Sequence, residues 1–374
     1  MYRLFITITL IVFKAEAQDA SALRIADSLY ALGNYSKAIT FYEKVDGVEV
    51  KLAKSYEALG NKGKALAYYR EALRIHPSSL SIQYNYGKLL FNSAQYREAD
   101  SIFKLLSNAD ERNPNFPYHL GLIKEKRGDT TAWKDFSKVL WLDPNHQNAL
   151  YKTARRLVEK RIFVSAVPYI DRGLEADPNS IRFLNLQALT FFHNNNYHGA
   201  LDSYKKLEEL GHGNQQLHEN MAVCFSKTNQ YEKAIDHYTI LINQYDDTHA
   251  KWHYQIAGCF SALRYDEKAQ RHLEIAIVLK DISTEAEYWS LSQLFGRQKK
   301  YAAQMDALRK VIAQNPKNDN AHYFLATAAD NYFQDKKEAI PYYERYLKKF
   351  EKGKFIQYAR QRIADIKTQS HFKD

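Results

Sequence analysis

The chain has 374 residues, of which 45% are hydrophobic and 26% charged, a balance typical of folded soluble proteins and not of disordered ones. Its formal net charge is +10. Glycine (14) and proline (8) are scarce, which excludes collagen-like and low-complexity chains and disfavours a β-rich fold with many turns. Two cysteines are too few for a disulfide-built scaffold or a four-cysteine zinc site.

The N-terminus has the pattern of an export signal. Arg3 precedes ten apolar residues, LFITITLIVF, and Ala15 and Ala17 stand at the two positions that a signal peptidase reads. A permanent membrane anchor needs about 20 apolar residues, so this run is too short. We therefore expect a signal peptide over residues 1–17 and an exported protein, periplasmic or secreted, with no integral membrane segment after cleavage. The alternative is a cytosolic protein with a fortuitously hydrophobic N-terminus.

Three rows of residues recur along the chain with a period of about 34 residues. The first row is small: Ala26, Ala53, Gly87, Gly121, Ala154, Ala188, Ala222, Ala257, Ser292 and Ala326. The second row follows about twelve residues behind and is small except at one position: Ala38, Ala65, Ala99, Ala132, Ala166, Ala200, Ala234, Ala269, Gln304 and Ala339. The third row, four residues later, is large: Tyr42, Tyr69, Phe103, Phe136, Ile170, Tyr204, Tyr238, Leu273, Leu308 and Tyr343. Small residues let a neighbouring helix approach closely, and large ones fill the space that remains.

Each repeat has the pattern of two amphipathic helices joined by a tight turn. Apolar residues recur at intervals of three and four, which is the stripe of a helix that buries one face. Turn-forming residues separate the small rows at Gly33, Gly60, Asn195 and Asn229. Prolines end several repeats at Pro77, Pro144, Pro178 and Pro316. One helix pair cannot bury its apolar face alone, so stacking with its neighbours must complete the core.

The segment ALGNKGKALAYYREALRIHP, residues 58–77, resembles the turn and second helix of the tetratricopeptide repeat family. The segments YEKAIDHYTILI from Tyr231 and EAIPYYERYL from Glu338 repeat the same theme. This resemblance implies an all-α, right-handed α-solenoid of about ten helix-turn-helix repeats over residues 18–350. The step between repeats one and two is seven residues short, and Gln304 replaces a small residue, so repeats one and nine are expected to be irregular.

The last segment, residues 351–374, is expected to hold a capping helix and a basic tail. From Arg345 to Asp374 there are nine basic residues and three acidic ones, while the rest of the chain is close to balanced. That balance predicts no nucleic-acid surface. A solenoid needs a terminal helix with a polar outer face, and residues 355–367 have this pattern.

The family resemblance implies a non-catalytic scaffold or adaptor that binds a peptide or a folded protein in a concave groove. In such proteins the first helices line the groove, and the position three residues before the first small row commonly faces the ligand. Aromatic side chains occupy this position at Tyr84, Tyr118, Tyr151, Tyr254, Trp289 and Tyr323. The alternative is that they pack between repeats. The regular repeats three to eight are expected to form the continuous groove.

A basic group in repeat five offers a second candidate. It consists of Lys152, Arg155, Arg156, Lys160 and Arg161, with Arg182 following in repeat six. Arg155 is expected to face the groove, where a guanidinium could bind a carboxylate; a solvated helix surface is the alternative. A second functional hypothesis is an envelope assembly factor whose basic C-terminal end touches an anionic polymer or lipid.

The sequence lacks the common catalytic and phosphate-binding motifs. The chain has no glycine-rich phosphate loop, no G-x-S-x-G and no H-E-x-x-H, so we expect no enzyme activity and no cofactor. His249 and His253 have helical i, i+4 spacing, but no third ligand is evident, so no metal is predicted. Cys224 and Cys259 occupy equivalent places in adjacent repeats, where stacked helices are too far apart for a disulfide, and two free thiols are expected.

Overall fold

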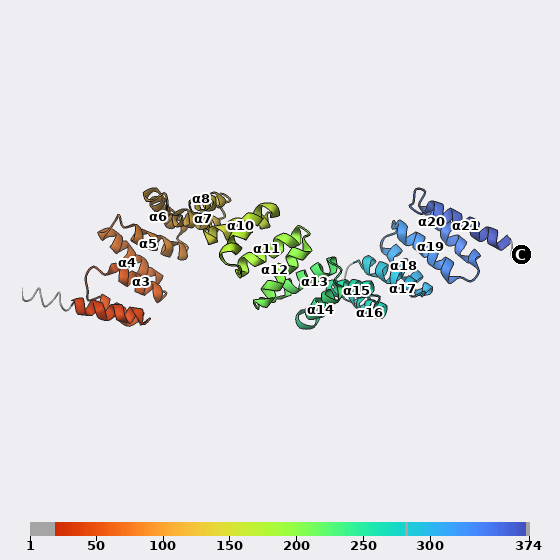
Figure 1. Cartoon of the computed structure of the whole chain (residues 1–374), viewed down its shortest axis with the longest axis horizontal. Helices are drawn as coiled ribbons and strands as arrows, with labels where there is room; N and C mark the ends of the chain where they lie inside the picture. The colour runs from red at the N-terminus through yellow and green to blue at the C-terminus, as the bar shows by residue number, and fades with distance from the viewer. Residues whose placement is uncertain (1–18, 281–282, 372–374) are drawn as a thin grey trace, which may run out of the picture. The chain divides into compact units, whose positions relative to one another are not determined.

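The computed structural model describes residues 19–280 and 283–371, and its secondary structure is helical throughout these ranges, without strands. The signal peptide expected over residues 1–17 lies outside the described residues. Successive helices form hairpins, and each second helix packs on the first helix of the next repeat within a unit (Figure 1). Among the described residues, no helix is both long enough and apolar enough to cross a membrane.

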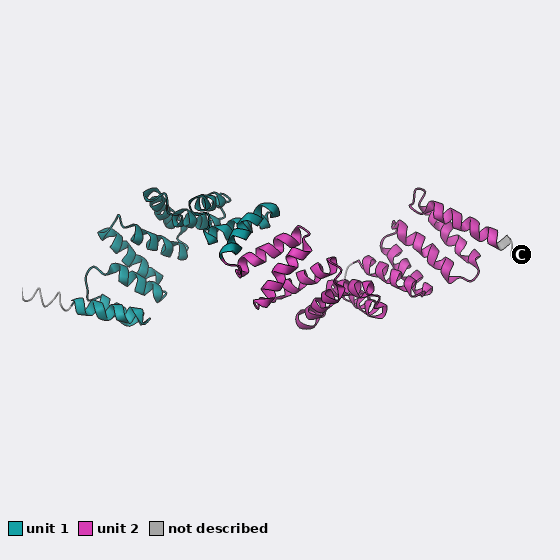
Figure 2. Ribbon diagram, in the orientation of Figure 1, with its two compact units in different colours: residues 1–176 teal, residues 177–374 magenta. Residues whose placement is uncertain are grey.

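The N-terminal unit, residues 1–176, contains repeats one to five (Figure 2). Its helices are a first helix over residues 19–31, α2 (Tyr35–Tyr42), α3 (Glu49–Ala58), α4 (Lys62–Ile75), α5 (Leu80–Asn92), α6 (Tyr96–Ala109), α7 (Asn115–Lys126), α8 (Ala132–Leu142), α9 (Gln147–Glu159) and α10 (Phe163–Ala176). Each consecutive pair from this list forms one repeat, so that α3 and α4, for example, are repeat two.

The C-terminal unit, residues 177–374, contains repeats six to ten and a last helix. Its helices are α11 (Ile181–His193), α12 (Tyr197–Glu209), α13 (Gln215–Lys227), α14 (Tyr231–Ile240), η1 (Leu241–Tyr245), α15 (Ala250–Ala262), α16 (Asp266–Val278), α17 (Glu285–Arg297), α18 (Tyr301–Gln314), α19 (Asp319–Tyr332), η2 (Lys336–Ala339), α20 (Ile340–Lys349) and α21 (Ile356–His371). The predicted ten helix pairs and the terminal helix are therefore present.

The three periodic rows are buried along the whole chain, as the pattern predicts. Residues of the first and third rows have complementary sizes, which lets the two helices of a repeat pack closely. A Cβ placed on Gly121 would lie 2.7 Å from Cε1 of Phe136, and one on Gly87 would lie 3.0 Å from Cε2 of Phe103. The absence of a side chain in the first helix thus makes room for the aromatic ring of the second helix.

The turn inside each of the first nine repeats contains one residue in the left-handed region. Glycine or asparagine stands there in five repeats, at Gly33, Gly60, Gly128, Asn195 and Asn229, and an ordinary residue in four, at Ala94, Arg161, Arg264 and Lys299. These residues end the first helix with the backbone conformation that glycine adopts most easily. Asparagine side chains then cap several helix N-termini; Oδ1 of Asn61, for example, accepts a hydrogen bond from the backbone N–H of Lys64.

Repeat one is irregular, as its short step predicts, whereas repeat nine is regular despite Gln304. In repeat one, α2 has only eight residues. In repeat nine, Gln304 is buried, and the space for its amide comes from Gly296 on the preceding helix, where a Cβ would lie 2.7 Å from Nε2 of Gln304. In this repeat the small residue is Gly296 on α17, which faces Gln304 on α18. The two helices therefore still form a regular hairpin.

The last helix, α21, covers the apolar face of repeat ten. It packs on α20, and its Ala359 and Ile366 join a core cluster with Ala326, Tyr343 and Tyr346. Tyr346 also accepts a hydrogen bond at its hydroxyl oxygen from the backbone N–H of Phe355, at 2.9 Å. This arrangement is the cap that the sequence predicts for the end of a solenoid.

Candidate partner-binding site

A hollow of about 390 Å³ opens on the first helices of repeats seven to nine, within the C-terminal unit. Each of α13, α15 and α17 contributes lining residues: Val223, Lys227, Tyr254, Gly258, Trp289 and Gln293 are among them. The floor is open at Gly258, where a Cβ would meet no heavy atom within 4 Å. Three successive first helices thus present one continuous concave surface.

A second hollow, of about 640 Å³, adjoins the first and shares Tyr254 and Trp289 with it. Residues of α17 and of the start of α19, including Glu285, Asn318 and Asn320, line this second hollow. Hydrogen bonds fix its edge, because Oε1 of Glu285 accepts from Nδ2 of Asn318 at 2.9 Å. We call the two hollows together the C-terminal groove.

Four charged residues line the C-terminal groove: Lys227, Lys280, Glu285 and Arg297. Arg297 lies at one end, but its Nη2 donates to Oδ1 of Asp266 and to Oγ of Ser261, each at 2.8 Å, so its charge is paired. Gln255 lines the first hollow, and its buried Oε1 has no hydrogen-bond partner among the described residues. A buried acceptor that lacks a donor lowers the stability of the fold.

Family comparisons agree with the helix-pair architecture. Two models described as tetratricopeptide repeat match residues 20–45 and 46–89, and a model described as anaphase-promoting complex, cyclosome, subunit 3 matches residues 159–239. The chain is a tetratricopeptide repeat protein. No curated protein gives a significant match to it.

Several solved structures are similar to parts of this repeat protein. One from Parabacteroides merdae shares 17% identity over 66% of this chain and 97% of its own, with a TM-score of 0.43. The C-terminal part of a repeat protein from Cytophaga hutchinsonii shares 14% identity over 64% of this chain and 98% of its own, with a TM-score of 0.49. The pilF protein of Pseudomonas aeruginosa shares 21% identity over 56% of this chain and 99% of its own, with a TM-score of 0.47.

The six aromatic residues predicted to face a ligand are all half-buried, but their surroundings differ. Tyr84 packs between repeats: its ring centroid lies 6.0 Å from those of Phe103 and Phe116, and its hydroxyl is 3.2 Å from Nε2 of His119. Tyr323 stacks on Phe355 at 4.2 Å.

Tyr118 also has aromatic neighbours, with its ring 5.9 Å from Phe136 and 5.0 Å from His146. Trp289 lies edge-to-face on Phe324 at 5.6 Å and also lines both hollows, as Tyr254 does. The structure therefore brings Tyr254 and Trp289 together at one site. Tyr84, Tyr118 and Tyr323 have the surroundings of packing residues.

The basic group of repeat five borders a smaller hollow, of about 200 Å³, in the N-terminal unit. Its charges are partly paired: Nε of Arg155 donates to Oε1 of Glu159 at 2.7 Å, and Nζ of Lys152 donates to Oε2 of Glu125 at 2.5 Å. The hydrogen bond that Arg155 donates to Glu159 raises the pKa of Arg155. Tyr151 belongs to the same helix, α9, whereas Arg182 belongs to the C-terminal unit, where its guanidinium lies over the ring of Phe183 at 5.2 Å.

The histidine pair singled out by helical spacing does not form the closest contact. Nδ1 of His253 lies 3.0 Å from Nδ1 of His272, while His249 stacks on Trp252 at 4.0 Å. A second pair, His218 and His237, has the same 3.0 Å contact one repeat earlier. Both pairs could have been recognised in the sequence. The two histidines of each pair are 19 residues apart, and the second pair follows the first by 35 residues, about one repeat.

The two cysteines are free and buried, as expected. Burial raises the pKa of Cys224 to about 12 and also raises that of Cys259. Both sulfurs are therefore protonated at neutral pH and unreactive, since the thiolate is the nucleophilic form. Both side chains are part of the buried core.

Proposed function

We propose that this tetratricopeptide repeat protein is a non-catalytic adaptor whose C-terminal groove binds an extended segment of a partner protein. Support comes from one arrangement: Tyr254 and Trp289 stand on successive first helices and both line the two adjoining hollows. Aromatic side chains supply large apolar contact area with a polar end, and they lose little conformational entropy on binding.

The lining of the C-terminal groove favours a particular ligand chemistry. A large apolar or aromatic side chain of the bound segment would occupy the first hollow above Gly258, where a Cβ would meet no heavy atom within 4 Å. Arg297 pairs with Asp266 and Lys280 pairs with Glu287, so the remaining lining charges are those of Lys227 and Glu285, which offset each other. We therefore expect affinity that changes little with salt concentration.

Selection from a random peptide display library tests this function with the full chain as the immobilised target. Enriched peptides should share a large apolar residue, and Tyr254→Ala should weaken a selected peptide by about thirtyfold, the loss typical of an aromatic anchor worth about 2 kcal/mol. Tyr84→Ala is the matched control, because Tyr84 packs between repeats of the other unit and should leave affinity unchanged. Peptides that bind equally well to Tyr254→Ala would refute the assignment.

Export is a second element of the proposal, and it rests on Arg3, the run LFITITLIVF and Ala15-x-Ala17. Mature protein from the native host should begin at Gln18 and be recovered from the periplasm or the medium. N-terminal mass spectrometry that finds an intact Met1 in the cytosol would contradict export. Sedimentation with anionic envelope material, in place of peptide binding, would favour the envelope role of the basic C-terminal end.

A further inference from the structure

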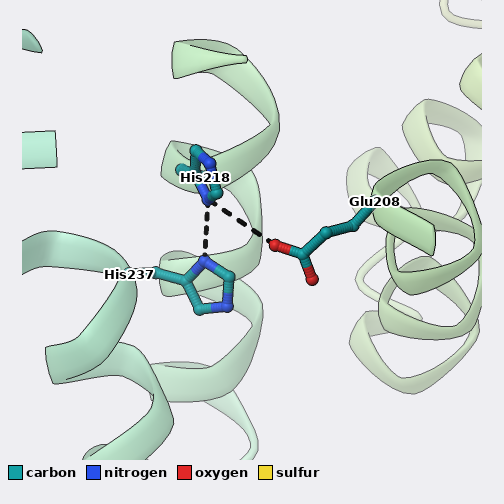
Figure 3. A group of neighbouring side chains, drawn as sticks. All are labelled: Glu208, His218 and His237. Carbon is teal, nitrogen blue, oxygen red and sulfur yellow. Dashed lines mark hydrogen bonds and ion pairs between the residues drawn. The ribbon is translucent and has the colours of Figure 1, made fainter. Parts of the chain in front are cut away.

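Three potential metal ligands converge where repeats six and seven meet, and none of them is among the residues that line the C-terminal groove. Glu208 belongs to α12, His218 to α13 and His237 to α14, and one ligand atom from each lies within 4.8 Å of the others. Figure 3 shows the carboxylate of Glu208 pointing at the two imidazole rings, which face each other. Three separate helices therefore supply one compact set of donors.

The distances are close to those of a tetrahedral zinc site. Nδ1 of His218 lies 3.0 Å from Nδ1 of His237 and 4.0 Å from Oε1 of Glu208. With metal–ligand bonds of about 2.0–2.1 Å, tetrahedral geometry places donor atoms about 3.3 Å apart. The two nitrogens need to separate by only a few tenths of an ångström. Glu208, exposed at the end of α12, can move toward them.

The surroundings prepare His237 for coordination. Its ring stacks on Phe225 with centroids 5.4 Å apart, which restricts its orientation. His218 is partly buried, and its ring centroid lies 6.2 Å from that of Tyr245.

Repeat eight provides an internal comparison. Its pair of His253 and His272 has the same 3.0 Å contact between Nδ1 atoms. Asn243 stands ten residues before His253, as Glu208 stands ten residues before His218, so this pair lacks the carboxylate. In addition, Nε2 of His253 is 2.9 Å from the backbone oxygen of Asp247. Within the described ranges, the three-ligand group occurs only in repeats six and seven.

We propose that Glu208, His218 and His237 bind one divalent zinc-class cation, with a fourth coordination position left for water or for a side chain of a partner. Nitrogen and carboxylate donors suit Zn²⁺, and three protein ligands with an open position are common for this ion. Bound metal would tie α12 to α13 and α14, and so would join repeats six and seven.

Calorimetric titration of the full chain, free of any histidine tag, with zinc chloride is the direct experiment. One zinc ion should bind per chain, and Glu208→Gln should weaken binding about tenfold or more, the smallest effect expected of a lost ligand. His272→Gln removes a histidine of the other pair and should leave the affinity unchanged. Glu209→Gln removes a neighbouring exposed carboxylate and should likewise have no effect.

A thermal measurement gives an independent readout, because a ligand that binds only the folded state raises the melting temperature by mass action. Excess zinc should raise the melting temperature of the wild-type chain and of His272→Gln, and should raise that of Glu208→Gln much less. Glu208 is exposed, so its conservative substitution should leave the fold intact. No zinc binding by the wild type, equal binding by Glu208→Gln, or loss of binding in His272→Gln would overturn the proposal.

Discussion

Arg362 of the last helix binds Asp330 of α19 through two hydrogen bonds, from Nε to Oδ2 at 2.7 Å and from Nη2 to Oδ1 at 3.1 Å. Asp330 is only 7% exposed, and its Oδ2 also accepts from the hydroxyl of Tyr343 at 3.1 Å. The capping helix is therefore attached to repeat ten by a two-point charged contact as well as by its apolar face. The hydrogen bond to Asp330 raises the pKa of Arg362, which remains charged at any ordinary pH.

Removal of this contact should loosen the cap. Arg362→Ala leaves the Asp330 carboxylate buried without its cation, and we expect a loss of about 1–3 kcal/mol in the free energy of unfolding of repeat ten. Arg360→Ala removes the same charge from an exposed position of the same helix and should change stability by less than about 0.5 kcal/mol. Hydrogen exchange should show faster exchange confined to α19, α20 and α21. Equal effects of the two variants would contradict the role of Arg362.

Two glycines on first helices should respond in opposite directions to the same substitution. Gly121→Ala places a Cβ 2.7 Å from Phe136 and should destabilise the chain by about 1–3 kcal/mol through overpacking. Gly258→Ala meets no atom within 4 Å and should stabilise α15 by up to about 1 kcal/mol through helix propensity. Urea unfolding of the two variants measures both changes. A shift of the same sign in both would refute the packing account.

The four ordinary residues at left-handed turn positions carry backbone strain that glycine would relieve. Ala94 has φ 59° and is exposed, so Ala94→Gly should raise the free energy of unfolding by up to about 1 kcal/mol. Ala67, exposed inside α4, is the matched control, because Ala67→Gly should lower stability by about 1 kcal/mol. Thermal denaturation distinguishes the two signs, and a destabilised Ala94→Gly chain would be inconsistent with strain at this turn.

His119 should make the N-terminal unit sensitive to mild acid. Its ring stacks on Phe103 at 4.5 Å, and burial, with smaller contributions from Lys88 and His146, lowers its pKa to about 4. The unfolded chain has the usual histidine pKa of about 6.5, so protonation favours unfolding. The neutral His119 ring therefore contributes fully to stability above about pH 6.5. As the pH falls toward 4, the free energy of unfolding decreases by about 3 kcal/mol in total.

The matched measurement is urea unfolding between pH 7 and pH 4 for the wild type and for His119→Phe, which keeps a ring in the stack. Stability of the wild type should fall more steeply over this range than that of the variant. Parallel pH profiles would show that His119 is already protonated in the fold or is too exposed to matter.

The sequence predicts the architecture well because burial in a solenoid is periodic. Every member of the three rows lies at a repeated contact, so recurrence over ten repeats reveals the helix pairs, their turns and the buried faces. Gln304 shows the limit of this reasoning: its partner, Gly296, lies outside the three rows, and the exchange of small and large residues becomes visible only when the helices are placed.

The site could be predicted only in part, because an aromatic position in a repeat has two possible environments. Tyr84 and Tyr254 occupy equivalent positions in the pattern, yet Tyr84 is surrounded by aromatic rings of its own and the next repeat, and Tyr254 borders two hollows. The difference depends on neighbouring side chains from other helices. The pairing of Arg155 with Glu159, four residues later, was readable from helical spacing and limits the availability of this arginine for a ligand.

The affinity of a selected peptide for Gly258→Leu tests the central claim most directly. The leucine side chain should fill the part of the first hollow next to position 258 and block the bound segment. Leucine has a higher helix propensity than glycine, so the substitution should also stabilise the fold. We predict a loss of affinity of tenfold or more, of the order expected when an anchoring pocket is closed, with an unchanged or higher melting temperature. Unchanged peptide affinity in a stably folded Gly258→Leu chain would contradict the C-terminal groove as the binding site.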